Sequence, residues 1–183
     1  MSQSASFYSI ANADFITIEQ SDDKELDIAP FVKDYCTLDD SYMALEFTLV
    51  SGQDEEAITF IEEIFNPTES FGGSDFSDID IDNIDPQALE AMVMNDASVY
   101  YLPPEKISDI TRVLENIDDS FIAANYDPAT LNDNDIYPAK WHNDGSPELQ
   151  YNAAHLQKSL SELKSFFQKA AMEKDYILTY MQG

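Results

Sequence analysis

The most regular spacing of hydrophobic residues lies between residues 149 and 174, where apolar positions recur at intervals of four, three, four and three. This periodicity predicts a long amphipathic helix with one face packed against a core. The segment YILTYMQ, residues 176–182, follows it and predicts a final strand, because it is rich in β-branched and aromatic residues. The apolar positions of the helix are Leu156, Leu160, Leu163, Phe167 and Ala170.

Shorter patterns predict the other elements. Alternating apolar and polar residues in SASFYSIAN predict a first strand over residues 4–12, and ASVYYLP predicts another over residues 97–103. Residues 127–147 are rich in Asn, Asp and Pro and are predicted to form a loop. Apolar spacing and capping residues predict helices over residues 39–52, 54–67, 85–94, 104–117 and 118–126.

Together these elements predict an α+β fold, in which a small mixed sheet is flanked by helices and a long C-terminal amphipathic helix is followed by a final strand. The chain has no internal repeat and no low-complexity linker, so residues 1–183 are predicted to form a single domain. Residues 66–84 are predicted to be an exposed acidic loop within this domain.

The charge of the chain limits its partners. Acidic residues outnumber basic ones by 36 to 9, and the formal net charge is −27. Such a charge repels free nucleic acid and anionic membranes, so the charge leaves a basic protein, a cation or no specific partner as the alternatives. Residues 149–183 hold three acidic and four basic side chains, so the negative charge belongs to the preceding part of the chain.

The cysteine content and the apolar runs favour a soluble cytoplasmic protein, with the monomer as the favoured state. Cys36 is the single cysteine, so no internal disulfide can form, and its acidic neighbours argue against a reactive thiol. No basic residue precedes Lys24, and no apolar segment resembles that of a signal peptide. No run approaches the roughly 20 apolar residues that span a bilayer.

The segment GGSDFSDIDIDNIDPQALE, residues 72–90, partly matches a calcium-binding EF-hand loop. Three aspartates stand at its first alternating positions, but Asn83 replaces the required Gly and Leu89 the required Glu. The segment is therefore predicted to be a solvated acidic loop without a calcium site. The three aspartates are Asp78, Asp80 and Asp82.

The chain also lacks the residue sets of common catalytic sites. Cys36, His142 and His155 are too scattered to predict zinc ligation, and no cofactor is expected. There is no GxSxG nucleophile motif and no glycine-rich phosphate loop. A single arginine, Arg112, argues against phosphorylated substrates. A binding protein is therefore favoured over an enzyme.

From residue 98 onward, the segments YLPPEKI, YDPATLN and DIYPAKW are followed by a long helix and by YILTYMQ. These segments resemble the YfbM-like family, domain of unknown function 1877, and LDDSYMALEFTLVSG resembles its N-terminal helix. The resemblance implies an α+β fold, a bacterial source and no established catalytic residues. Residues 66–84 depart from the family in being longer and more acidic. The most specific matches are Ile136, Tyr137, Pro138 and Trp141.

Two hypotheses for the function remain open. In the first, the chain is an immunity or inhibitor protein that neutralises a basic toxin, such as a nuclease, by occupying its active or substrate-binding site. In the second, it is a small-ligand-binding protein or an enzyme with a pocket formed by Tyr137, Trp141 and His142. That segment is otherwise explained as a loop held on the core by aromatic burial. The partner-binding residues of the first hypothesis are Asp75, Asp78, Asp80, Asp82, Asp85, Glu55, Glu56, Glu62 and Glu63.

Overall fold

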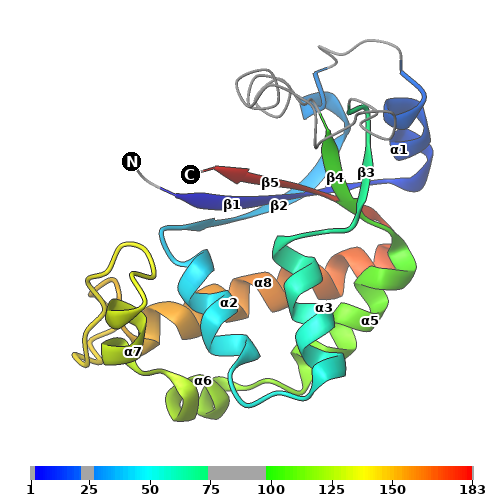
Figure 1. Ribbon diagram of the computed structural model, residues 1–183. Coiled ribbons are helices and arrows are strands. Elements are labelled where there is room, and N and C mark those ends of the chain that lie inside the picture. Colours follow the sequence, from blue (N-terminus) through cyan, green and yellow to red (C-terminus); the bar gives the residue numbers. More distant parts are fainter. Residues whose placement is uncertain (1–2, 22–26, 74–97, 183) are drawn as a thin grey trace, which may run out of the picture.

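A computed structural model describes residues 3–21, 27–73 and 98–182, and its centre is a five-stranded sheet (Figure 1). The strand order is β2-β1-β5-β4-β3. Every described pairing is antiparallel, so the predicted α+β class is confirmed but the sheet is not mixed. The strands are β1 Ser4–Ile10, β2 Val32–Asp39, β3 Glu69–Phe71, β4 Val99–Leu102 and β5 Tyr176–Gln182.

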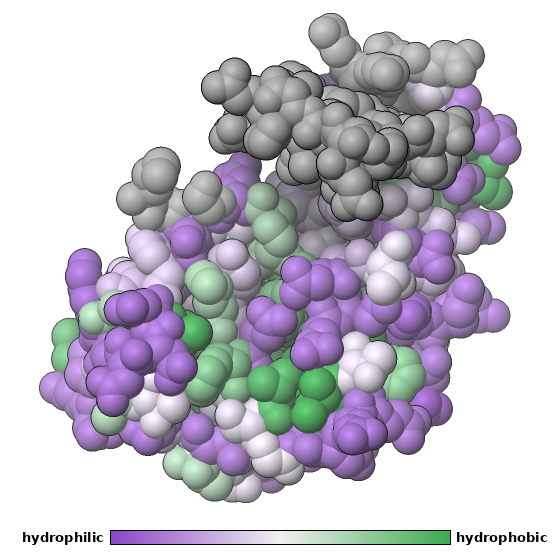
Figure 2. Space-filling view, in the orientation of Figure 1, coloured by the Kyte–Doolittle hydropathy of each residue, from purple (hydrophilic) through white to green (hydrophobic). Residues whose placement is uncertain are grey.

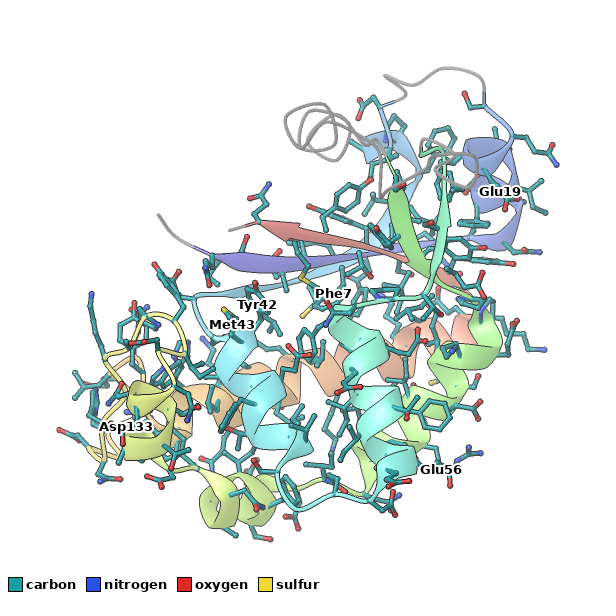
Figure 3. The ribbon with its side chains drawn as sticks, in the orientation of Figure 1. Phe7, Glu19, Tyr42, Met43, Glu56 and Asp133 are labelled. Carbon is teal, nitrogen blue, oxygen red and sulfur yellow. The ribbon has the colours of Figure 1, made fainter. Side chains whose placement is uncertain are left out.

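One face of the sheet is covered by a layer of helices (Figure 1). The apolar stripe predicted for the last helix is confirmed, because all five of its residues are buried in the main core. Phe7 of β1 lies on this side of the sheet (Figure 3), and its ring centroid is 6.2 Å from those of both Phe65 and Phe167. The layer consists of α2 Tyr42–Val50, α3 Glu55–Phe65, α5 Pro104–Glu115 and α8 Ala153–Glu173.

The opposite face of the sheet carries a second, smaller core under α1, Asn12–Glu19. Phe15 of α1 stacks on Tyr176 of β5, with centroids 3.8 Å apart and an interplanar angle of 5°. The same ring lies 4.8 Å from that of Tyr101. A short 3-10 helix, η1 Ala29–Phe31, leads into β2. Both faces of the sheet therefore bury aromatic side chains.

Several elements differ from the prediction. The predicted loop over residues 127–147 contains α7, Pro128–Asp133, which follows α6, Asp119–Asn125. Residues 69–71, within the predicted acidic loop, form β3. The elements α1 and β2 were not predicted at all. The predicted helix over residues 85–94 lies outside the described residues. In the described part of the chain, no helix is both long enough and apolar enough to cross a membrane.

Candidate functional site

The four glutamates of α3 that were predicted to bind a partner lie in different environments. Glu55 and Glu56 are exposed in the first turn, after Asp54, whose carboxylate accepts a hydrogen bond from the Ala57 amide at 2.9 Å. Negative charge is favourable at this end of a helix because it opposes the positive end of the helix dipole. Both side chains therefore have a structural role, whatever they bind.

Glu63 is not part of an exposed face, and its prediction as a surface residue is wrong. It is 7% exposed and accepts hydrogen bonds from the Thr68 hydroxyl at 2.9 Å and from Lys106 at 3.2 Å. Burial alone would raise the pKa of Glu63, but these hydrogen bonds outweigh it and hold the pKa below its ordinary value. Glu63 therefore ties the segment after α3 to α5 and is not available to a partner.

Glu62 is exposed in the last turn of α3, and its charge interacts with that of Glu46 on α2. Burial raises the pKa of Glu46 to about 7, and the charge of Glu62 adds to the shift. Among the described residues, the Asn66 side-chain amide donates a hydrogen bond to Glu46, at 3.3 Å from Oε1. We call Glu46, Glu55, Glu56 and Glu62 the acidic helix face.

The charge of Glu62 does not serve the stability of α3. A carboxylate in the last turn faces the negative end of the helix dipole, and a second carboxylate nearby repels it. Hydrophilic residues cover much of this side of the helical layer (Figure 2). Glu46 and Glu62 therefore concentrate negative charge where folding gains nothing from it.

The other predicted partner-binding residues cannot be compared with the structure. They belong to the dense acidic segment that follows β3. All of them lie outside the described residues: Asp75, Asp78, Asp80, Asp82 and Asp85.

Trp141 is a core residue that holds the loop around it. It is 3% exposed, and its indole N–H donates to the Ile136 carbonyl at 3.0 Å. Its backbone amide donates to the side chain of Asn132 at 2.9 Å. The rings of Tyr126 and Tyr151 meet it edge-on, with centroids 6.4 and 5.7 Å away. This packing matches the aromatic burial that the sequence offered as the alternative to a pocket.

The two residues predicted to share a pocket with Trp141 are held in separate polar contacts. Tyr137 hydrogen-bonds to Asp40, and burial together with that carboxylate raises the pKa of the phenol. The main chain of His142 is fixed, because its amide donates to the Tyr151 carbonyl at 3.0 Å and its carbonyl accepts from Tyr126 at 2.9 Å. Both contacts order the loop.

His155 is a residue whose role the sequence did not reveal. Its Nδ1 accepts a hydrogen bond from the Tyr151 amide at 3.1 Å, and its ring stacks on Trp141 with centroids 6.5 Å apart. Burial lowers the pKa of His155, which keeps the imidazole neutral as an acceptor. Only the tertiary fold brings Trp141 against His155, so the spacing of residues on α8 does not reveal this contact.

The described residues offer little for metal or thiol chemistry. Among them, no group of three or more His, Cys, Asp or Glu side chains is placed to hold a metal ion. Cys36 is 7% exposed, and burial raises the pKa of its thiol to about 12, with the charges of Glu162 and Asp34 contributing. A thiol with this pKa stays protonated and is a poor nucleophile.

The geometry is that of a small α+β protein with one helical layer and an acidic surface. A family model described as domain of unknown function (DUF1877) matches residues 1–180, so the chain belongs to this family. The resemblance seen in the sequence is thereby confirmed.

The fold is also similar to the crystal structure of YfbM from Escherichia coli, a protein of unknown function, with a TM-score of 0.63. The two chains are 14% identical, and the match covers 98% of this chain and 99% of that one. At this identity, the similarity shows the fold alone. Comparison with curated proteins gave no significant match.

Proposed function

We propose that this protein binds a basic protein partner and acts as an immunity or inhibitor protein, covering the active or substrate-binding site of a toxin such as a nuclease. The observation that supports this best is the acidic helix face. Negative charge at Glu46 and at Glu62 opposes folding, and such a cost is typical of residues retained for binding.

The few basic residues of the chain are largely used within the fold. None of the ion pairs found among the described residues involves the acidic helix face, so its charge is left for a partner. These ion pairs join Lys33 to Glu173 and Asp175, Lys106 to Glu63, Arg112 to Asp109, Lys158 to Glu162, and Lys169 to Asp34.

A basic substrate-binding site is the natural target of such a surface. Enzymes that act on nucleic acid gather Lys and Arg to bind phosphates, and carboxylates from an inhibitor can pair with the same side chains. Opposite charges also accelerate association, because the long-range field guides the two proteins together. An inhibitor that binds fast protects the cell before its partner acts.

The test is co-expression with the product of the neighbouring gene, scored by rescue of growth and by a co-purifying complex. The double variant Glu46→Gln, Glu62→Gln should slow association by about tenfold, since charged interface residues mainly set the on-rate. The matched control is Asp133→Asn with Glu148→Gln, which neutralises two exposed carboxylates elsewhere on the molecule. Asp133 lies on α7, far from Glu56 and α3 (Figure 3). Absence of both rescue and complex would refute the proposal.

A further inference from the structure

A cavity of about 520 Å³ opens beside the acidic helix face, where the chain leaves α3 above β4 and β5. Phe65, Pro67 and Met181 contribute apolar wall, and Asn66 contributes an amide. Tyr100 and Met181 are 45% and 37% exposed, so apolar surface remains open at this place. An apolar surface beside polar groups is typical of a binding site.

The cavity contains an unusual buried hydroxyl. Thr179 lines it and is 4% exposed, yet its Oγ1 has no hydrogen-bond partner among the described residues. Thr179 pairs with Phe7 on one side and Tyr100 on the other, so the three side chains form a row on the helix-facing side of the sheet. A buried polar atom without a partner is unfavourable, and a ligand that supplies the missing hydrogen bond removes this cost.

Two features indicate that the ligand is a cation. The Asn66 amide in the cavity wall is hydrogen-bonded to Glu46, so the carboxylate lies one side chain away from the cavity. Glu62 adds a second negative charge beside Glu46. The exposed ring of Tyr100 can in addition receive a cation on its face.

We propose that this cavity binds the guanidinium side chain of an arginine presented by the basic partner. The inference rests on the proposed function, and it identifies this arginine as the residue that anchors the partner in the interface. The aliphatic stem of arginine suits Phe65, Pro67 and Met181, as long cationic side chains bury their methylene groups on apolar surface. The planar head supplies several N–H donors at once, for the Thr179 hydroxyl and for Glu46. A buried arginine is a common anchor in protein interfaces.

The first arm of the test uses a small probe and needs no partner. Nα-acetyl-argininamide is titrated into the full chain and followed by NMR, with the citrulline analogue as an uncharged control of the same shape. Saturable shifts at Tyr100 and Thr179, and affinity for the citrulline analogue lower by about tenfold or more, support the cavity as a guanidinium site. Equal binding of the two probes, or no shifts at these residues, overturns it.

The second arm uses the variant Thr179→Val, which removes the hydroxyl and keeps the shape and charge of the site. Probe and partner should both bind about tenfold more weakly, since the lost hydrogen bond is made to a charged group. Thr59→Val, on the exposed side of α3, is the matched control and should bind as the wild type does. The thermal midpoint of Thr179→Val should not fall, because a buried hydroxyl without a partner has been removed.

The outcomes separate the two proposals. A partner that binds wild type and Thr179→Val equally leaves the proposed function standing and overturns the cavity as its anchor. If the cavity binds argininamide but no basic protein is captured, the proposal that its ligand is an arginine of a partner is overturned. The cavity is then a site for small cations.

Discussion

Glu46, which lies near Glu62, shows how a single residue can link folding to binding. A carboxylate whose pKa is raised in the folded state holds a proton that the unfolded chain has already released. Burial, together with the negative charge of Glu62, keeps Glu46 partly neutral near pH 7. A bound cation would reverse this effect, so binding should release a proton near neutral pH.

This pair yields a prediction for the pH dependence of stability. The pKa of Glu46 is about 7 in the fold and near 4.5 when unfolded, so its contribution to the unfolding free energy should decline as the pH rises between these values. Glu46→Gln should abolish this decline, measured by urea denaturation at several pH values. His155, whose pKa is lowered, contributes with the opposite sign and cancels in the comparison. Identical pH profiles for wild type and variant would contradict the prediction.

Glu63 gives a second prediction at the residue scale. Glu63→Ala should lower the unfolding free energy by about 1–3 kcal/mol, because it leaves Lys106 and the Thr68 amide without their buried partner. Glu56→Ala, on the same helix but exposed, is the control and should change stability by less than about 1 kcal/mol. Both are measured by chemical denaturation. Alanine is a better helix former than glutamate, so a loss as large in Glu56→Ala would show that removing any carboxylate of α3, and not the buried polar contact, explains the result.

At the scale of elements, α8 is the scaffold of the fold, since its apolar stripe meets the sheet and α5 in one core. Leu160 lies in the middle of this stripe and is 1% exposed. Leu160→Asp should therefore unfold the protein, because an unpaired buried charge costs several kcal/mol, close to the roughly 5–15 kcal/mol stability of a domain.

The control for this prediction is the neighbouring residue on the solvent side of α8. Ser161→Asp should leave the thermal midpoint nearly unchanged, because Ser161 is exposed. Circular dichroism on heating measures both variants. A folded Leu160→Asp protein would mean that the stripe does not hold the helix on the sheet.

The elements that were predicted correctly are those whose buried and exposed positions form a clear pattern along the sequence. Strong apolar spacing identified α3, α5 and α8, since one face of each helix is buried and the other is solvated. α1 escaped prediction because its buried residues, Phe15 and Ile18, are accompanied by the exposed Ile16. The charged positions of β2 hid a strand because β2 is at the edge of the sheet, where charges are tolerated.

The candidate site was less predictable than the fold. Spacing along α3 placed Glu63 with the other glutamates, but Lys106 and Thr68 come from outside that helix and draw it inward. Glu46 and Glu62 belong to two different helices, so no local sequence pattern shows that their charges lie close together. Asp127 caps α7, and an Asp-Pro pair is a common start of a helix. The Asn and Asp residues around this pair made the segment resemble a loop, so α7 was not predicted.

At the scale of the whole molecule, the charge of −27 should dominate the kinetics of binding. Association with a basic partner should slow steeply as salt rises to 0.15 M, where the screening length is about 8 Å. Stopped-flow rates at several salt concentrations measure this. A rate that is independent of salt would contradict electrostatic guidance.

The acidic segment that follows β3 permits a separate test. Replacing Asp75, Asp78, Asp80 and Asp82 with Asn should slow association and leave the thermal midpoint unchanged or slightly higher, because carboxylates so close together in the sequence repel each other. Binding of an unrelated basic protein, such as a histone, should be far weaker than that of the partner in every variant. A lower thermal midpoint would show that these aspartates serve the fold.

The place of β5 between β1 and β4 has a consequence for how the chain folds during synthesis. Ser4 pairs with Gln182, so the centre of the sheet joins β1 to a strand that the ribosome makes long after it. Before residues 176–182 emerge, β2–β1 and β4–β3 are separate two-stranded ribbons, and such ribbons are marginally stable. The nascent chain therefore cannot complete its sheet before β5 has been synthesised. A chain interrupted before Tyr176 would expose the edges of β1 and β4, which can pair with other chains and aggregate.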